Sequence, residues 1–160
     1  TPGGHYRVQR EDLVRFLRDT GHPAAAVERG SSRILVVDED PANVTNYTRA
    51  LRKLGPEVEV MGAGDGVTGL IMLGSWKPDV LVLDLRMRGL DGIDVVRRLG
   101  ELPELRTRVI VLSIYLTPAI AEDLQGLGVF GCLDKPAALD KLVALAEEAL
   151  GIASSAVRNT

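Results

Sequence analysis

Acidic side chains stand at the ends of two aliphatic segments that the sequence predicts to be buried strands. Asp38, Glu39 and Asp40 follow the segment 34–37, and Asp84 closes the segment 80–83. A carboxylate at the end of a buried strand costs free energy unless it is paired or binds something, although such carboxylates also serve as plain turn residues. Carboxylates that crowd together either take raised pKa values or bind a cation. Because oxygen ligands without a nearby His or Cys favour Mg²⁺, these residues predict a magnesium site.

A hydroxyl and an ammonium group stand at corresponding places further along the chain. Ser113 closes the aliphatic segment 109–112, and Lys135 lies just past the segment 129–133. Beside a divalent cation, a hydroxyl and a lysine suit the three oxygens of a phosphoryl group, whose transfer depends on positioning and charge neutralisation. A carboxylate nucleophile can accept that group as an acyl phosphate. Asp84, central among the predicted strands, is the candidate acceptor.

Five short aliphatic segments that alternate with helical patterns must position these residues. The strands are predicted at 34–37, 57–61, 80–83, 109–112 and 129–133, and the helices at 41–54, 67–75, 93–99, 118–127 and 138–150. This alternation predicts an α/β fold, a parallel sheet with helices on both faces and right-handed crossovers. Ligands of such sheets bind beyond the carboxyl ends of the strands. The acids, the hydroxyl and the lysine are therefore expected at one edge of one sheet.

Residues 33–150 resemble the receiver domain of bacterial two-component response regulators. The matching motifs are Val36-Val37-Asp38-Glu39-Asp40-Pro41, Leu81-Val82-Leu83-Asp84-Leu85-Arg86-Met87, Leu90-Asp91-Gly92, Val109-Ile110-Val111-Leu112-Ser113 and Leu133-Asp134-Lys135-Pro136. The resemblance implies a flavodoxin-like fold with five parallel strands in the order 2-1-3-4-5. It also implies a two-component phosphorelay function, in which a cytoplasmic switch accepts a phosphoryl group and regulates transcription.

The resemblance assigns a role to each residue of the predicted site. Asp84 would take the phosphoryl group from a histidine kinase or a phosphotransfer protein. The Mg²⁺ ligands would be Glu39, Asp84, the backbone carbonyl of Arg86 and, through a water, Asp38. Ser113 would bond a phosphoryl oxygen and signal its presence, and Lys135 would pair with the anion.

Three residues depart from the family pattern. Arg88 stands where the family usually has proline, which predicts a more mobile loop after Asp84. Ile114 follows Ser113 where a small residue is usual, and its bulk is expected to narrow access to the acceptor. Cys132 takes the place of an aromatic switch residue, so that signalling by an aromatic rotamer is not expected. The departures leave open a second hypothesis, a phosphorylation-independent pseudo-receiver that acts as a protein-interaction module.

A third hypothesis is an enzyme. Asp38 and Asp40 have the spacing of the nucleophile and acid of a haloacid-dehalogenase-like phosphatase. The chain has no clear cap insertion and no second acidic pair at the fourth predicted strand. We therefore expect a switch without enzymatic turnover.

The segment before the predicted sheet divides into a short unit, residues 1–22, and a linker, residues 23–32. Residues 1–13 resemble the wing and the following helix of the excisionase/MerR-like helix-turn-helix family, on the motif Thr-Pro-Gly-Gly-His-Tyr-Arg-Val-Gln-Arg-Glu-Asp-Leu. Carried over, this resemblance places His5 and Arg7 near a DNA backbone or minor groove. The recognition helix of that family would precede Thr1, so DNA binding is expected only of the full-length protein.

Composition limits the remaining possibilities. The 160 residues carry a net charge of −3, which argues against nonspecific binding to nucleic acid or to a membrane. The sequence has no apolar run of about 18 residues, the length that a membrane span needs. One cysteine excludes an internal disulfide and fits a cytoplasmic protein. Residues 151–160 are expected to form a C-terminal tail, and a homodimer through the last predicted helices and strand is possible.

Overall fold

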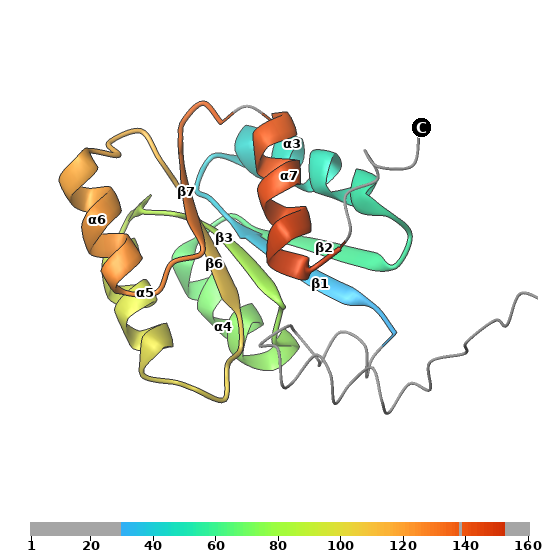
Figure 1. Cartoon of the computed structure of the whole chain (residues 1–160), viewed down its shortest axis with the longest axis horizontal. Helices are drawn as coiled ribbons and strands as arrows, with labels where there is room; N and C mark the ends of the chain where they lie inside the picture. The colour runs from blue at the N-terminus through green and yellow to red at the C-terminus, as the bar shows by residue number, and fades with distance from the viewer. Residues whose placement is uncertain (1–29, 138, 153–160) are drawn as a thin grey trace, which may run out of the picture.

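The computed structural model describes residues 30–137 and 139–152. Its centre is a parallel five-stranded sheet in the order β2-β1-β3-β6-β7 (Figure 1). The strands are β1 (Ser32–Val37), β2 (Val58–Ala63), β3 (Val80–Asp84), β6 (Arg108–Ser113) and β7 (Gly131–Asp134). Counting only the strands of this sheet, the order is 2-1-3-4-5, and the flavodoxin-like fold predicted from the sequence is confirmed.

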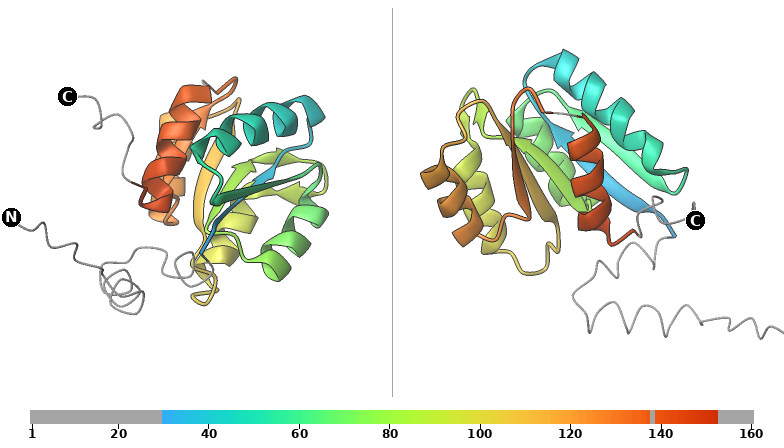
Figure 2. Two further views of the ribbon diagram at one scale, coloured as in Figure 1. Left: turned by 90° about the vertical axis from the view of Figure 1, so that its right-hand side faces the viewer. Right: turned by 45° about the horizontal axis from the view of Figure 1, so that its top comes forward.

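Helices cover both faces of the sheet. They are α3 (Pro41–Leu51), which continues into a 3₁₀ turn (Arg52–Leu54), α4 (Gly66–Trp76), α5 (Gly92–Gly100), α6 (Pro118–Gly126) and α7 (Leu139–Leu150). Helices α3 and α7 lie on one face, and α4, α5 and α6 lie on the other (Figures 1 and 2). Each face has its own apolar core: Tyr47, Leu51 and Leu142 belong to the first, and Leu73 and Leu124 to the second.

The central strands are buried on both sides, which explains their continuous aliphatic sequence. Ile34, Leu35, Val80 and Ile110 each expose less than 1% of their surface. Because successive side chains of a strand point to opposite faces, each of these strands supplies both cores. The strand ends predicted from the sequence agree with the structure to within about two residues.

The parallel register brings the polar residues to one edge of the sheet. Val37 pairs with Leu83, Asp84 with Leu112 and Ser113 with Asp134. The residues directly after Val37 and Asp134 therefore lie at the same edge as Asp84. Two side-chain caps begin helices close to this edge: Asp40 accepts a hydrogen bond from the Ala42 backbone N–H and Asp91 from the Ile93 N–H.

Residues 86–91, predicted as a loop, form a small antiparallel hairpin of β4 (Arg86–Met87) and β5 (Leu90–Asp91). Its turn is made by Arg88 and Gly89, and Gly89 has a φ of 71°. Directly after it, the Gly92 N–H donates to the Leu85 carbonyl at 3.1 Å. A Cβ at position 92 would lie 2.7 Å from the Leu85 Cα atom, so this close approach requires glycine.

Exposure varies within single elements of the fold. Leu139, the first residue of α7, is 42% exposed, whereas Leu142, Ala146 and Leu150 of the same helix are buried. Arg108, the first residue of β6, is half-buried, and its guanidinium stacks on the Phe130 ring at 5.2 Å and donates to the Ala149 carbonyl.

Helix α4 is apolar on its outer face as well as its inner one. It contains no charged residue, and Val67 and Ile71 are 67% and 66% exposed.

No helix in the described part of the chain combines the length and the apolar character needed to cross a membrane. Ser32, assigned to the linker from sequence, is the first residue of β1. The predictions for residues 1–22 and for the tail from 153 onward lie outside the described residues.

Candidate functional site

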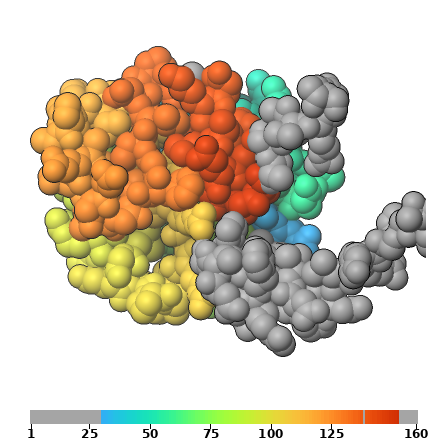
Figure 3. All heavy atoms as spheres, viewed as in Figure 1, coloured from blue at the N-terminus to red at the C-terminus, as the bar shows by residue number. Residues whose placement is uncertain are grey.

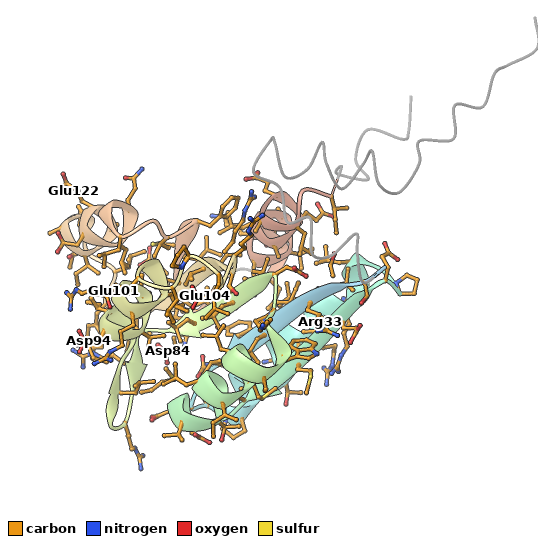
Figure 4. All side chains as sticks on the ribbon, turned by 90° about the horizontal axis from the view of Figure 1, so that it is seen from below. Arg33, Asp84, Asp94, Glu101, Glu104 and Glu122 are labelled. Carbon is orange, nitrogen blue, oxygen red and sulfur yellow. The ribbon has the colours of Figure 1, made fainter. Side chains whose placement is uncertain are left out.

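Asp84 is the last residue of the central strand β3 (Figure 4). Its side chain is 12% exposed. One carboxylate oxygen, Oδ1, accepts a hydrogen bond from the Arg86 backbone N–H at 3.1 Å. The other oxygen, Oδ2, lies 3.0 Å from the ammonium nitrogen of Lys135. This carboxylate is therefore held by the backbone through one oxygen and by a cation through the other.

Asp38, directly after β1, is 2% exposed and fully engaged. Its Oδ1 atom accepts the Asp40 backbone N–H at 2.9 Å, and its Oδ2 atom lies 3.2 Å from the Asn43 side-chain nitrogen. The Lys135 ammonium lies 2.5 Å from the same Oδ2 atom. Asn43 was not predicted as a site residue. It lies in the first turns of α3, which begins immediately after the acidic segment, and this placement is the signal that could have identified it.

Lys135 joins the two aspartates. Its side chain is 8% exposed, and its backbone N–H donates to the Ser113 carbonyl at 2.9 Å, which fixes it beyond the end of β6. Burial lowers the pKa of Lys135, but its hydrogen bonds and charge contacts with Asp84 and Asp38 outweigh burial, so its pKa is raised. The lysine is therefore a permanent positive charge between two carboxylates at neutral pH.

Tyr47, predicted only as a core residue of α3, lies close enough to this charged group to be affected by it. Burial raises the pKa of its hydroxyl, the charge of Lys135 lowers it and the charges of Asp38 and Asp84 raise it; the net pKa is raised. Tyr47 is 4% exposed and stays neutral at physiological pH. It therefore lies beside the site without adding charge to it.

Glu39 is turned toward the hairpin. Its Oε1 atom accepts a hydrogen bond from the Arg88 backbone N–H, and its Oε2 atom lies 3.9 Å from the Arg88 Nε atom. The Glu39 side chain is 31% exposed, and it lines the same cavity as Ser113. The third predicted carboxylate is thus at the site but bound to the hairpin tip.

Ser113 ends β6 and is 2% exposed. Its Oγ atom accepts a hydrogen bond from the Tyr115 backbone N–H at 3.1 Å and lines a cavity of about 670 Å³. Across this cavity the Arg86 guanidinium stacks on the Tyr115 ring, 4.0 Å from its centroid. The side chains of Arg86 and Tyr115 were not predicted to shape the site. Neither position carries a sequence signal, because the contact depends on the relative placement of the hairpin and the loop after β6.

The structure describes the surroundings of two of the departures from the family pattern. Ile114 is 60% exposed and is not among the residues that line the cavity, whereas Tyr115 lines it. That the bulk of Ile114 narrows access to Asp84 stays a prediction. Cys132 in β7 is half-buried against the core of α4, α5 and α6, and burial raises the pKa of its thiol. An aromatic ring is absent from that position, as the sequence indicated.

The donor set suits Mg²⁺ in kind. The predicted donors are carboxylate oxygens and a backbone carbonyl, the ligands that Mg²⁺ prefers. One cation, the Lys135 ammonium, already lies between Asp38 and Asp84. Within the ranges 30–137 and 139–152, however, no three His, Cys, Asp or Glu side chains gather closely enough to hold a metal ion. The predicted ligands therefore fit the ion by chemistry, but Glu39 would have to leave Arg88 to join the others.

The predicted DNA-contacting residues, His5 and Arg7, lie outside the described residues, and their assignment stays a prediction. The homodimer prediction concerns the face formed by α6, β7 and α7, which Figure 3 shows in orange and red. That prediction also stays open.

Comparison with known proteins agrees with this geometry. Residues 34–147 match the family described as the response regulator receiver domain. The response regulator MprA of Mycobacterium bovis is 40% identical over 120 residues, which cover 71% of this chain and 48% of MprA. The chain thus spans about half the length of the curated relatives it matches.

Solved structures give the same result. The signal receiver domain of NarL from Mycobacterium tuberculosis is 35% identical, with a TM-score of 0.66, and the match covers 76% of this chain and 98% of that one. The receiver domain of a DNA-binding response regulator from Colwellia psychrerythraea is 26% identical, with a TM-score of 0.71 and coverage of 76% and 99%.

Proposed function

The chain belongs to the response regulator receiver domain family, and from that membership we propose that it accepts a phosphoryl group on Asp84 in a Mg²⁺-dependent reaction. The donor is a histidine kinase or a phosphotransfer protein of a two-component system in the cytoplasm. The protein itself acts as a switch and not as an enzyme with turnover. Phosphorylation then changes the surface that its output partner recognises.

The observation that carries this proposal is the position of Lys135, 3.0 Å from Asp84. In the transfer, an Asp84 oxygen forms a bond to phosphorus while the bond between phosphorus and the donor's histidine nitrogen breaks. The ammonium group is placed to offset the negative charge that arrives, and Ser113 offers a hydroxyl at the cavity wall. Mg²⁺, when bound by Asp84, Glu39, the Arg86 carbonyl and, through a water, Asp38, supplies further charge neutralisation.

We extend the proposal to the full-length protein. Its output is regulation of transcription through DNA binding, since residues 1–13 resemble the end of a helix-turn-helix domain and the curated relatives are about twice as long as the matched segment. His5 and Arg7 are the candidate DNA contacts.

A second function, a pseudo-receiver that binds a protein partner without phosphorylation, is favoured by two observations. Cys132 replaces the aromatic residue through which the family signals, and Glu39 is bound to Arg88 instead of facing Asp84. Labelling with acetyl phosphate separates the two functions. Mg²⁺-dependent incorporation at Asp84 supports the first, and a folded protein that incorporates nothing supports the second.

The phosphatase hypothesis receives no support. Asp38, its nucleophile, is 2% exposed and paired with Lys135, and Asp40, its acid, caps α3. Turnover of an aryl phosphate that is lost in Asp38→Asn would be the result that revives it.

A further inference from the structure

The tip of the β4–β5 hairpin holds the carboxylate of Glu39. The backbone N–H of Arg88 donates to Oε1, and the Arg88 Nε atom lies 3.9 Å from Oε2. The Arg88 side chain is 97% exposed, so its ion pair with Glu39 is screened by water and contributes little. The backbone hydrogen bond is the stronger of the two contacts because its donor is fixed by the turn and its acceptor is charged.

This contact competes with the use of Glu39 as a metal ligand. A carboxylate oxygen that accepts the Arg88 N–H must give up that bond, or share it, when it coordinates a cation beside Asp84. In the described portion of the chain, no three acidic side chains are gathered around one point. The site is therefore held in an arrangement in which two of its carboxylates face Lys135 and the third faces the hairpin.

We propose that Arg88 is a latch on Glu39 that sets the affinity of the site for Mg²⁺. The latch rests on the proposed function, since it acts on the cation that the phosphoryl transfer uses. Binding of Mg²⁺ draws Glu39 away from the Arg88 N–H, and the free energy of that hydrogen bond is subtracted from the free energy of Mg²⁺ binding. Arg88 is thus a positioning residue, and it acts through its backbone more than through its charge.

The turn allows this N–H to be removed selectively. Met87 pairs with Leu90, so Arg88 and Gly89 are the two central residues of the turn. Among the described residues, the only non-glycine with a positive φ is Lys77, and Gly89 has a φ of 71°. A positive φ at the second central position alone is the pattern of a type II turn, which favours proline at the first. Arg88→Pro therefore suits the turn and lacks the N–H, whereas Arg88→Ala lacks only the guanidinium.

The test is a Mg²⁺ titration of the ¹⁵N-labelled 160-residue chain, followed by amide shifts in two-dimensional NMR. We expect Arg88→Ala to bind Mg²⁺ at most about threefold more tightly than wild type, as for the loss of an exposed ion pair. We expect Arg88→Pro to bind about tenfold more tightly than Arg88→Ala, the low end of the range for one hydrogen bond to a charged group. In wild type, saturation with Mg²⁺ should also speed exchange of the Arg88 amide proton.

A double-mutant cycle shows whether the effect passes through Glu39. Glu39→Asp keeps the charge but shortens the side chain by one methylene, so that it no longer reaches the hairpin tip. In that background, Arg88→Pro and Arg88→Ala should have equal affinities for Mg²⁺.

The outcomes are distinct. If Arg88→Pro and Arg88→Ala bind Mg²⁺ equally tightly when residue 39 is the native glutamate, the latch is overturned and the proposed function stands. The same conclusion follows if Mg²⁺ does not change the exchange of the Arg88 amide proton in the wild-type protein. Failure of every folded variant to bind Mg²⁺ at millimolar concentrations overturns the Mg²⁺-dependent function and the latch together. If Arg88→Pro does not fold, the exchange rate of the Arg88 amide proton in wild type, with and without Mg²⁺, tests the latch alone.

Discussion

The ammonium nitrogen of Lys135 lies 3.0 Å from Asp84 Oδ2 and 2.5 Å from Asp38 Oδ2. Three residues from the ends of three strands thus form one charged group that is nearly closed to solvent. Two carboxylates this close would repel each other without the lysine. The ion triad is therefore a structural element of the sheet edge and, under the proposed function, supplies the positive charge that faces the phosphoryl group.

The first prediction concerns the pH dependence of stability. The pKa of Lys135 is raised in the folded protein, so its contribution is fully present below the pKa of an unfolded lysine, about 10.4, and is lost as pH rises through the folded value. The free energy of unfolding, measured with urea, should fall above about pH 10. The raised pKa of Tyr47 acts in the same direction, so Tyr47→Phe is needed to separate the two.

Lys135→Met tests the assignment of that pH dependence. It should destabilise the protein by about 3 kcal/mol at pH 7, because it leaves two poorly exposed carboxylates side by side without the cation between them. It should also flatten the decline in stability at high pH. Lys141→Met, which alters an exposed lysine of α7, is the matched control and should keep the wild-type profile. An unchanged pH profile in Lys135→Met would show that the triad is not coupled to folding.

The second prediction concerns access to Asp84. Arg86 and Tyr115 line the same cavity as Ser113, which ends the strand beside Asp84, and an exposed stack of this kind is worth about 0.5–1 kcal/mol. Tyr115→Ala should therefore speed labelling by acetyl phosphate about two- to fivefold, as measured by intact-protein mass spectrometry over time. Tyr115→Phe keeps the ring and should label at the wild-type rate.

Ile114→Ala provides the second comparison for the same experiment. Ile114 is exposed and lies outside the cavity lining, so its truncation should leave the labelling rate unchanged. A faster rate in Ile114→Ala than in Tyr115→Ala would mean that the isoleucine obstructs the acceptor after all.

The third prediction compares two glycines of one helix. A Cβ at Gly92 would lie 2.7 Å from the Leu85 Cα atom and 2.9 Å from its carbonyl oxygen, and backbone atoms cannot yield easily. Gly92→Ala should lower the free energy of unfolding by about 1–3 kcal/mol, as overpacking does. At Gly100 the nearest atom is 3.9 Å away, so Gly100→Ala should be neutral or slightly stabilising. Equal stabilities of the two variants in urea unfolding would contradict the close packing of Leu85 against the first residue of α5.

Much of the fold followed from the sequence because local signals agreed with each other. Aliphatic runs marked every strand of the sheet, and Asp40-Pro41 marked the start of α3. The order of those residues along the chain also placed Asp38, Asp84 and Lys135 at one edge, since parallel strands end on the same side. The contact of Asp84 with Lys135 is the structural counterpart of that prediction.

The rest depended on contacts that no local pattern encodes. The Arg88 N–H meets Glu39 across 49 positions of sequence, and the Arg86–Tyr115 stack joins two segments that become neighbours only in the folded sheet. The short hairpin at 86–91 was missed because two-residue strands carry too few residues to show an alternation.

The fourth prediction concerns the single cysteine. Burial raises the pKa of the Cys132 thiol, so little of the reactive thiolate is present at neutral pH. Alkylation by iodoacetamide at pH 7.5 should be slow in the native protein and fast after unfolding in guanidinium chloride, as followed by mass spectrometry. Rapid alkylation of the native protein would indicate that β7 opens readily and would contradict the packing described for that strand.

The central claim is that Asp84 accepts a phosphoryl group, and acetyl phosphate labelling of the chain with and without Mg²⁺ tests it most directly. We predict that wild-type protein gains the mass of one phosphoryl group only with Mg²⁺, on the peptide that contains Asp84. Asp84→Asn should gain no mass. Asp91→Asn, which alters a nearby exposed aspartate, is the control and should still be labelled on Asp84. A folded wild-type protein that gains no mass, or an Asp84→Asn variant labelled as fully as wild type, would contradict the account.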